Sequence, residues 1–265
     1  MAGMLEDKVC VVTGSGRGIG RATAVEMARR GAKVVVSDVG ENADETLEAV
    51  RDAGGDAIYI RCDITRFDEV KALMDGAAEH FGGIDVLHNN AGVHESDLHG
   101  SSTVDTLPDE IWELVFNVNI RGVFWTTKAA APHLRASTRG PSIVNCASTG
   151  GLLGYPNSSA YCASKGAVVN FTRATAVDLA ADGVRCNCYC PGSVQTPMIE
   201  GFMAAAADDP SAMSGLVGAQ LIDRIGQPEE IARLVCFLAS DDASFINGAV
   251  YVIDGGKLAW RGTRG

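Results

Sequence analysis

Apolar and β-branched residues gather in short runs that alternate with segments of helical periodicity along almost the entire chain. The pattern predicts seven strands, at residues 9–12, 33–37, 57–60, 85–88, 142–146, 184–189 and 250–253. It predicts helices at residues 19–30, 43–53, 67–81, 108–134, 160–181 and 228–238. Continuous apolar strands separated by helices are typical of a parallel sheet that is covered on both faces. We therefore expect an α/β fold with a doubly wound, seven-stranded parallel sheet.

Two segments interrupt this alternation. Residues 93–107 are polar and show neither helical nor strand periodicity, and residues 191–227 are rich in Gly, Ala and Met. Loops of this length are usually lids or binding loops, and both begin after a strand, at the edge where parallel sheets bind ligands. Because no linker divides the chain, we expect residues 1–265 to form a single domain with these two segments as its substrate loops.

The composition narrows the class of protein. Of the 265 residues 46% are hydrophobic, and Lys and Arg number 22 against 33 Asp and Glu, a net charge of −11. A chain without a basic surplus is not expected to bind nucleic acid or an anionic membrane. The first residues lack the pattern of a signal peptide, and the eight cysteines are spaced too irregularly for a disulfide framework. With no apolar run near the roughly 20 residues that span a bilayer, we expect a soluble protein of the reducing cytoplasm.

Glycines cluster directly after the first predicted strand, in the sequence TGSGRGIG at residues 13–20. A tight turn requires a positive φ at Gly14, and the close approach of a pyrophosphate requires the absence of a side chain at Gly18. Packing of the next helix on the strand favours Gly20, and that helix directs its free N–H groups toward the phosphates. The turn lies between a strand and a helix, which is the context that makes it a dinucleotide site rather than a simple tight turn.

Asp38 follows the second predicted strand, eighteen residues after Gly20. An acidic side chain at about this distance accepts hydrogen bonds from the ribose hydroxyls of NAD and would repel the 2′-phosphate of NADP. Arg17 favours the opposite interpretation, because a guanidinium in the glycine turn could bind that phosphate, although it could also be solvated. The direct repulsion at Asp38 is the stronger effect, so we expect NAD as the cofactor, with NADP less favoured.

Polar and small residues also follow the third and fourth predicted strands. Asp63 could reach the adenine amino group of a dinucleotide, or it could simply cap the turn near Thr65. The sequence NNAG follows the fourth strand, and its small Ala91 and Gly92 would let a cofactor lie against the backbone. Both groups stand at the sheet edge where we expect the cofactor.

Tyr161 and Lys165 are four residues apart, so on a helix they share one face. A phenol with a pKa of about 10 is a poor base at neutral pH, and a nearby ammonium group lowers that pKa. The pair suits proton exchange with an alcohol oxygen, although this spacing by itself is common on protein surfaces. Ser148, thirteen residues before Tyr161 at the end of a predicted strand, adds a hydroxyl that strengthens the catalytic interpretation.

In order and spacing these motifs resemble the short-chain dehydrogenase/reductase family, over about residues 5–257. The resemblance implies one Rossmann-like domain of seven strands. The matching positions are residues 13–20, Asp38, Asp63, residues 89–92, Asn119, Ser148, Tyr161, Lys165, Pro191, Gly192 and Thr196.

The resemblance also implies a mechanism. Tyr161 would exchange a proton with the substrate oxygen, Ser148 would polarise that oxygen, and Lys165 would lower the pKa of Tyr161 and bind the nicotinamide ribose. Asn119 would kink its helix and position a water that relays protons toward Lys165. Asn117 competes for this role, but Asn119 fits the family register better. The hydride chemistry belongs to the cofactor.

A further set of residues is implied to contact the dinucleotide. The Val194 backbone and the Thr196 hydroxyl would bind the nicotinamide carboxamide and so decide which ring face transfers hydride. The implied cofactor contacts are Gly14, Arg17, Gly18, Ile19, Gly20, Asp38, Cys62, Asp63, Asn90, Ala91, Gly92, Tyr161, Lys165, Pro191, Gly192, Val194 and Thr196.

Two clusters of reactive side chains have simpler explanations than a metal site. Cys186, Cys188 and Cys190 alternate along one predicted strand, and their sulfurs are too far apart for one tetrahedral ion without other ligands, so we interpret them as small buried apolar residues. We therefore predict no metal.

His94, Glu95 and His99 fall within residues 93–107, where we expect a solvated loop rather than a metal or acid/base site. This segment is longer than is common in the resembled family, and such an insertion can cover the substrate entrance. Tyr155 and residues 198–213 are further candidates for a mostly apolar pocket.

We therefore expect an NAD-dependent oxidoreductase that interconverts a secondary alcohol and a ketone of low molecular mass. One alternative is an NADPH-dependent 3-oxoacyl-thioester reductase, which Asp38 and the acidic charge disfavour. Another is a non-catalytic dinucleotide sensor, which the intact Ser148, Tyr161 and Lys165 disfavour. The choice of substrate does not follow from the fold.

The resemblance further implies a homotetramer. The helices that bear Asn119 and Tyr161 would pair across one interface, and the last strand across another. Trp260, in the tail after residue 256, could pack on a neighbouring subunit or fray.

Overall fold

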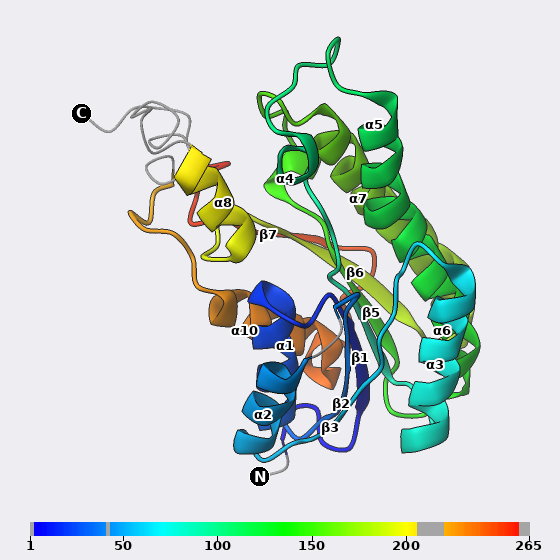
Figure 1. Ribbon diagram of the computed structural model, residues 1–265. Coiled ribbons are helices and arrows are strands. Elements are labelled where there is room, and N and C mark those ends of the chain that lie inside the picture. The colour runs from blue at the N-terminus through cyan, green and yellow to red at the C-terminus, as the bar shows by residue number, and fades with distance from the viewer. Residues whose placement is uncertain (1–2, 41–42, 206–219, 260–265) are drawn as a thin grey trace.

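A parallel sheet of seven strands forms the centre of the computed structural model, which describes residues 3–40, 43–205 and 220–259 (Figure 1). The strands are β1 (Val9–Thr13), β2 (Lys33–Ser37), β3 (Asp56–Tyr59), β4 (Val86–Asn89), β5 (Ser142–Cys146), β6 (Arg185–Pro191) and β7 (Val250–Ile253). Their order in the sheet is β3-β2-β1-β4-β5-β6-β7. The chain therefore changes direction across the sheet between β1 and β4, and the crevice outside their carboxyl ends is a ligand site in folds of this kind.

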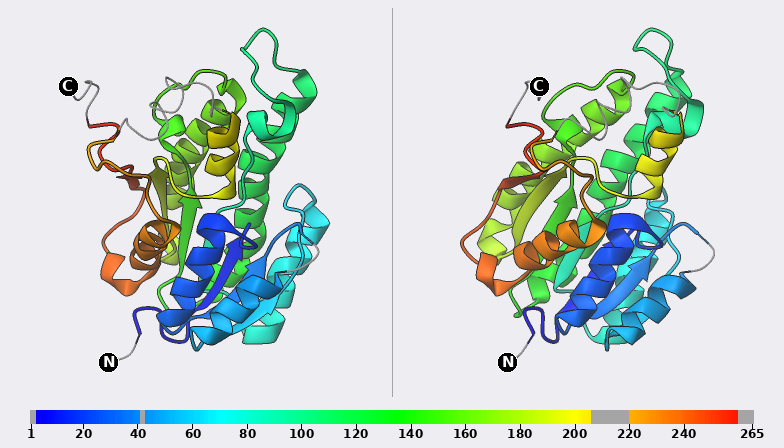
Figure 2. Two further views of the ribbon diagram at one scale, coloured as in Figure 1. Left: turned by 60° about the vertical axis from the view of Figure 1, so that its left-hand side comes forward. Right: turned by 90° about the vertical axis from the view of Figure 1, so that its left-hand side faces the viewer.

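Helices cover both faces of the sheet (Figure 2). One face carries α1 (Gly18–Arg29), α2 (Asp44–Asp52) and α10 (Pro228–Ala239), and α1 packs against both of the others. The other face carries α3 (Phe67–Phe81), α6 (Val123–Ala136) and α7 (Ser159–Leu179). The predicted α/β class and the doubly wound parallel sheet are confirmed.

The central strands are buried on both sides, which explains their continuous apolar runs. In β1, Cys10 and Val12 belong to the apolar cluster under α1 and α10, whereas Val11 belongs to the cluster under α3 and α6. In β2, Val34 and Val35 divide in the same way, because successive residues of a strand point to opposite faces. Burial of each such Val stabilises the fold by about 1.5–3 kcal/mol, so these strands form a rigid base for the residues at their ends.

The single helix predicted for residues 108–134 is divided. α5 (Asp109–Phe116) and α6 are joined by a π-helical turn, Asn117–Gly122, and Asn119 lies in its middle. Single π-helical turns inside helices are frequent at functional sites.

The two segments predicted as loops each contain a helix, so the expectation of irregular structure there is wrong. α4 (Glu95–His99) lies within residues 93–107, and α8 (Pro197–Ala205) within residues 191–227. A helix of five residues makes little more than one turn, which is too short to produce a periodic signal. Residues 206–213 and Trp260, which carried sequence predictions, lie outside the described residues.

Within the described ranges, no helix is long and apolar enough to cross a membrane. The eight cysteines are free thiols, and only Cys162 is not buried. Cys186, Cys188 and Cys190 lie in apolar clusters, and no cluster of three or more His, Cys, Asp or Glu residues in the described ranges could hold a metal ion.

Candidate active site

The glycine turn after β1 forms one wall of the candidate site. Gly14 and Gly18 have φ values of +63° and +56°, a region that other residues seldom occupy. A Cβ atom on Gly14 would lie 2.7 Å from the Cα of Ala91, and one on Gly18 would lie 3.4 Å from Cγ2 of Thr196. The turn thus contacts both the end of β4 and the loop after β6, which the sequence places far apart.

The first turn of α1 offers free backbone donors beside this turn. Arg17 is the N-cap residue, its side chain makes no capping hydrogen bond, and no acidic side chain lies in the first turn. Such a helix end binds an anion through its N–H groups and its dipole. Gly20 is buried within this turn, while Ile19 packs partly against the cluster under α1. These residues fit the pyrophosphate of a dinucleotide.

Asp38 lies directly under the glycine turn. Its Oδ2 accepts a hydrogen bond from the backbone N–H of Gly16 at 2.9 Å, and its Oδ1 accepts one from Gly40 at 3.3 Å. Arg17 is exposed. Partial burial raises the pKa of Asp97, and the nearby charge of Arg17 acts in the opposite direction, so Arg17 lies within electrostatic reach of α4. The carboxylate at the strand end fits ribose hydroxyls.

The ends of β3 and β4 close the cofactor side of the site. Asn90 donates from Nδ2 to the carbonyl oxygens of Thr13 and Gly14, at 3.1 and 2.9 Å, and so joins β4 to the glycine turn. Asp63 accepts hydrogen bonds from the backbone N–H and the hydroxyl of Thr65, at 2.9 and 2.7 Å. Of the two sequence interpretations of Asp63, the turn cap is therefore present. The buried Cys62 donates its N–H to the carbonyl oxygen of Asp38 at 3.0 Å.

The loop after β6 contacts the glycine turn at Gly18, whereas the end of β4 contacts it at Gly14. Pro191 is the last residue of β6, and Gly192 donates its N–H to the carbonyl oxygen of Ile253 at 3.0 Å. Val194 is buried and forms a bridge with Gly226. The Thr196 hydroxyl donates to the carbonyl oxygen of Val194 at 3.2 Å. These residues are thus placed beside the turn by backbone contacts.

Ser148, Tyr161 and Lys165 converge at the carboxyl end of β5. Tyr161 and Lys165 lie one turn apart in α7, with Lys165 Nζ 5.8 Å from the centre of the Tyr161 ring. Lys165 Nζ donates to the carbonyl oxygen of Cys146 at 2.9 Å. A Cβ atom added to Gly92 would lie 3.2 Å from the same Nζ. The Ser148 side chain accepts a hydrogen bond from the N–H of Gly150 at 3.0 Å, and it is close enough to Tyr161 to favour ionisation of the phenol.

The pKa of Tyr161 shifts in the direction opposite to the one that its spacing from Lys165 predicts. Burial raises the pKa of Tyr161, the hydrogen bond with Ser148 lowers it, and the net result is a rise above the ordinary value of a phenol. Burial also lowers the pKa of Lys165. The lowering of the Tyr161 pKa expected from Lys165 is therefore not found, because the cost of desolvating the phenolate exceeds what favours ionisation.

Asn119 joins three segments. It is fully buried, its Oδ1 accepts from the N–H of Val93 at 2.8 Å, and its Nδ2 donates to the carbonyl oxygen of Val93 at 2.9 Å and to the hydroxyl of Ser164 at 3.1 Å. The amide thus binds the start of the 93–107 segment and Ser164, the residue before Lys165 in α7. Asn117 is also in the π-helical turn, and its buried Oδ1 has no hydrogen-bond partner.

The expectation of a solvated loop at His94 and Glu95 is wrong. His94 is 5% exposed, Glu95 is 0% exposed, and only His99 of the three is on the surface. Glu95 accepts hydrogen bonds from backbone N–H groups of α7, and the His94 ring lies 4.5 Å from the Tyr161 ring between centroids. Burial lowers the pKa of His94 to about 4, so the ring is neutral at physiological pH. Both residues escaped the sequence reasoning because a polar, aperiodic segment carries no signal of burial.

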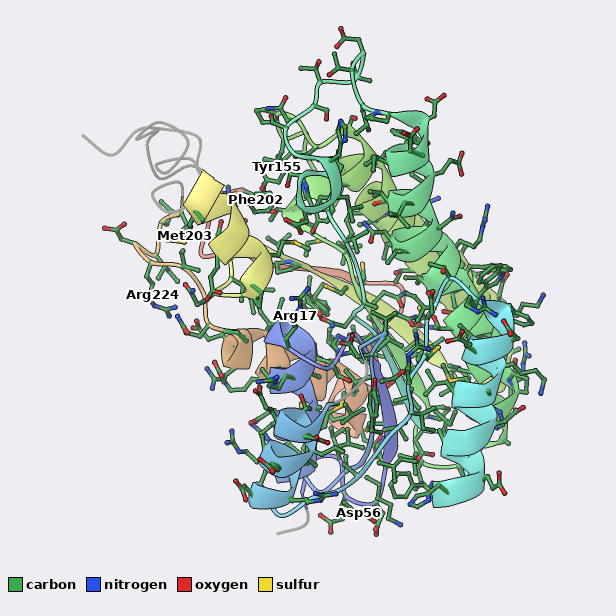
Figure 3. The ribbon with its side chains drawn as sticks, in the orientation of Figure 1. Arg17, Asp56, Tyr155, Phe202, Met203 and Arg224 are labelled. Carbon is green, nitrogen blue, oxygen red and sulfur yellow. The ribbon has the colours of Figure 1, made fainter. Side chains whose placement is uncertain are left out.

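Aromatic side chains surround this region (Figure 3). Phe202 of α8 meets His94 edge-on, with ring centroids 4.9 Å apart. Tyr155 bonds through its hydroxyl to that of Thr149 at 2.8 Å, and Lys257 Nζ lies 5.1 Å from the centre of its ring. These side chains belong to the N-cap of α4, to α8 and to the loop before α7, which Figure 1 shows at the same end of the sheet.

The family described as enoyl-(acyl carrier protein) reductase matches residues 14–257 of the chain. Among curated relatives, the chain is 43% identical to the cis-4-hydroxycyclohexanecarboxylate dehydrogenase of Sinomonas cyclohexanicum, over 96% of this chain and 97% of the relative. It is 42% identical to the meso-2,3-butanediol dehydrogenase of Serratia marcescens, over 96% of each chain.

Solved structures give the same picture. The fold matches the crystal structure of levodione reductase with a TM-score of 0.91 and 34% identity, covering 97% of this chain and 100% of that one. It matches carveol dehydrogenase from Mycobacterium avium, solved in complex with NAD, with a TM-score of 0.89 and 29% identity, over 97% and 100% of the two chains.

Proposed function

We propose that this chain, which belongs to the short-chain dehydrogenase/reductase family and is an oxidoreductase that acts on alcohols, uses NAD to interconvert a cyclic secondary alcohol and its ketone. The observation that carries the proposal is the convergence of Ser148, Tyr161 and Lys165 at the carboxyl end of β5, the same edge of the sheet that bears a glycine turn followed by an uncapped helix. A proton-exchanging group thus lies beside a dinucleotide cradle, which is what hydride transfer to or from a carbinol carbon requires.

The choice of NAD rests on Asp38. Its carboxylate lies against Gly16, at the sheet edge where the adenosine ribose of a dinucleotide binds in this fold. A 2′-phosphate there would meet a negative charge, and the exposed Arg17 lies within electrostatic reach of Asp97 in α4. The similarity to a carveol dehydrogenase solved with NAD supports the same choice. The bound dinucleotide supplies the hydride acceptor for oxidation and the donor for reduction.

The chain's own residues would handle the proton and the substrate oxygen. The Tyr161 phenolate would take the proton of the alcohol during oxidation, and the protonated Tyr161 hydroxyl would donate a proton to the ketone oxygen during reduction. The Ser148 hydroxyl would donate a hydrogen bond to that oxygen and keep it near Tyr161. Lys165, whose Nζ lies over the Tyr161 ring, would supply a positive charge there and bind the ribose hydroxyls of the cofactor. Asn119 holds the backbone at Val93 and would position a water that exchanges protons with Lys165.

The proposed substrate class follows from the apolar side of the site. The uncharged His94 ring contacts the rings of Tyr161 and Phe202, and Tyr155 lies on the loop before α7. A compact ring substrate would bury most of its surface against these side chains. The similarity to the cis-4-hydroxycyclohexanecarboxylate dehydrogenase supports a cyclic substrate. The similarity to the butanediol dehydrogenase extends the proposed class to small acyclic alcohols.

The second candidate function is reduction of a 3-oxoacyl thioester with NADPH. The match to a family whose description names an acyl carrier protein supports it, and Asp38 and the net charge of −11 oppose it. Both functions would use the same three residues, so the cofactor and the substrate distinguish them.

We further propose a homotetramer that works in the cytoplasm. Exposed apolar residues on α5, α6 and α7, namely Leu114, Phe124 and Val177, would form one interface, and Val252 of β7 with the fully exposed Phe245 would form the other. Free cysteines support a reducing compartment. A monomer in light scattering at micromolar concentration would contradict the assembly.

The test of the proposed function is a substrate panel. We expect cyclohexanol and related cyclic alcohols to reduce NAD at alkaline pH, with little turnover of NADP and none of a 3-oxoacyl thioester with NADPH. Tight NAD binding without turnover of any alcohol or ketone would reject the enzyme and favour a dinucleotide sensor. Preferred turnover of the thioester with NADPH would favour the second candidate.

A further inference from the structure

The first turn of α7, which bears Tyr161, is held by a side chain from another part of the chain. We propose that Glu95 is a positioning residue that fixes the first turn of α7 and thereby the place of the Tyr161 hydroxyl. This inference rests on the acid/base role of Tyr161 proposed above. It concerns Glu95 alone and assigns it no contact with the substrate or the cofactor.

The N-terminus of α7 has no cap of its own. Ser158 is the N-cap residue, a position where a Ser side chain usually accepts a hydrogen bond from the helix. Here its hydroxyl donates instead to the carbonyl oxygen of Pro156 at 2.9 Å, and no acidic residue lies in the first turn. The free N–H groups that begin every helix therefore need a partner from outside α7.

Glu95 supplies that partner. Its Oε1 accepts from the N–H of Ala160 at 3.0 Å, and its Oε2 accepts from the N–H of Tyr161 at 2.9 Å. The two residues are the second and third of the helix, and they lie 65 and 66 residues from Glu95 in the sequence. A carboxylate at a helix N-terminus is further stabilised by the helix dipole. One side chain thus performs the usual function of an N-cap and binds the backbone of Tyr161 directly.

The burial of Glu95 shows how closely the two segments are fitted. Its side chain is 1% exposed, and a buried carboxylate is stable only when hydrogen bonds replace its water. Each oxygen accepts a hydrogen bond from a backbone N–H of α7, and His94 Nδ1 lies 3.8 Å from Oε2. Loss of either contact would leave a charge without solvent, so the position of α7 relative to Glu95 is narrowly defined.

The residues before and after Glu95 are themselves held, so Glu95 is a fixed anchor rather than a mobile one. Asn119 binds Val93 through both its amide atoms. Ser96 donates its N–H to His94 Nδ1 at 3.1 Å, which leaves the proton of the neutral imidazole on Nε2. The π-helical turn, the 93–96 segment and the first turn of α7 therefore form one hydrogen-bonded unit.

A positioning role for Glu95 explains why a carboxylate is buried near the start of the 93–107 segment. Ser148, two residues after β5, influences the Tyr161 side chain, and Lys165 lies one turn further along α7. Neither residue fixes the start of the helix. A shift of α7 by a fraction of an ångström along its axis would move the Tyr161 hydroxyl from Ser148, and misplacement of a reacting group by about 1 Å can cost a hundredfold in rate. Glu95 restrains that shift at the residue concerned.

Two variants test the proposal in the full-length protein with NAD and cyclohexanol. Glu95→Gln keeps the shape but turns an NH₂ group toward one of the two backbone donors, and Glu95→Ala removes both acceptors. We expect kcat to fall by about 10- to 100-fold, least in Glu95→Gln, while the Kd of NAD changes less than about twofold. The isotope effect on kcat with carbinol-deuterated cyclohexanol should rise, because the chemical step becomes more rate-limiting. Without cofactor, amide exchange in a peptide spanning residues 158–165 should accelerate.

The matched control is Asp85→Asn. Asp85 is also a buried carboxylate that accepts a backbone hydrogen bond, from Val9 at 2.8 Å, but it precedes β4, at the opposite end of the sheet. This variant should lose thermal stability and keep its kcat per active site, its isotope effect and the exchange of residues 158–165.

Any of three results would overturn the proposal. The first is that kcat, the isotope effect and amide exchange are unchanged in both Glu95 variants. The second is a loss of activity that is matched by an equal loss of active sites, and the third is a weakening of NAD binding as large as the loss of kcat. A wild-type protein that turns over no alcohol would instead reject the proposed function. Wild-type turnover with Glu95 variants that behave like wild type rejects this inference alone.

Discussion

The imidazole ring of His94 lies against the phenol ring of Tyr161, with ring centroids 4.5 Å apart and ring planes at 39°. The contact places an uncharged flat side chain beside the group that we propose exchanges the substrate proton. It also joins α4 to α8, because the same imidazole meets Phe202 edge-on.

The contact predicts an effect of His94→Ala on substrate binding. Removing the ring takes away apolar surface worth about 1–2 kcal/mol, so the KM for cyclohexanol should rise by about 5- to 30-fold, while the Kd of NAD stays the same. Steady-state kinetics against His99→Ala, an exposed histidine of the same segment, provides the control. An equal rise of KM in both variants would contradict the assignment.

Replacement of the proposed acid/base gives a second prediction. Tyr161→Phe keeps the ring that packs on His94 and removes the hydroxyl, so the protein should fold and bind NAD but lose about 10²- to 10⁴-fold in kcat. Tyr251→Phe, in β7, is the matched control and should retain full activity. NAD-linked turnover by Tyr161→Phe at the wild-type rate would remove Tyr161 from the mechanism.

Cofactor choice can be tested at Asp38. Asp38→Ser removes the charge that would repel a 2′-phosphate and weakens ribose binding, so kcat/KM for NAD should fall and that for NADP should rise, each by about tenfold, or 1.4 kcal/mol. Asp56→Ser makes the same change at the start of β3, on an exposed residue away from the site (Figure 3). If the two variants have the same NAD to NADP ratio, Asp38 does not set the preference.

The direction of the Tyr161 pKa predicts how the two reaction directions depend on pH. Burial raises this pKa and the Ser148 hydrogen bond only partly offsets it, so the phenol keeps its proton at neutral pH. The protonated form is the one that donates to a ketone, whereas oxidation needs the phenolate. The kcat/KM of oxidation should therefore rise about tenfold per pH unit below the pKa of Tyr161, and the kcat/KM of reduction should fall only at alkaline pH. Profiles of kcat/KM in both directions provide the measurement, and an oxidation rate independent of pH would contradict the prediction.

Acid stability gives an independent check on the burial of His94. Burial lowers the pKa of His94 to about 4 from its ordinary 6.5, so between these values the unfolded chain binds a proton that the folded chain does not. The free energy of unfolding should therefore decrease as the pH falls from about 6.5 to about 4, by up to about 3 kcal/mol from this residue. Urea unfolding at several pH values should show a smaller decrease in His94→Gln and an unchanged one in His99→Gln. Identical pH dependence in all three proteins would mean that His94 is solvated.

Several features of this protein follow from the sequence because they are local. Apolar runs such as Val34 and Val35 mark strands buried on both faces, since a parallel sheet needs both sides covered. Gly14 marks a tight turn, since other residues rarely adopt its positive φ. Tyr161 and Lys165 share a helical face through their spacing alone. The fold class and the proposed catalytic residues could therefore be predicted from the chain.

Tertiary structure decided the surroundings of those residues. Glu95 reaches the backbone of Tyr161 across 66 residues, and Asn119 binds Val93 from 26 residues away. No local pattern encodes such contacts, because a short polar segment has the same composition whether it is solvated or buried. The pKa of Tyr161 was likewise decided by packing, since desolvation by the whole site exceeds the effect of the neighbours that the spacing identifies. The sequence thus determined which chemistry is available, and the packing of distant segments decided how its groups are held and at what pH they ionise.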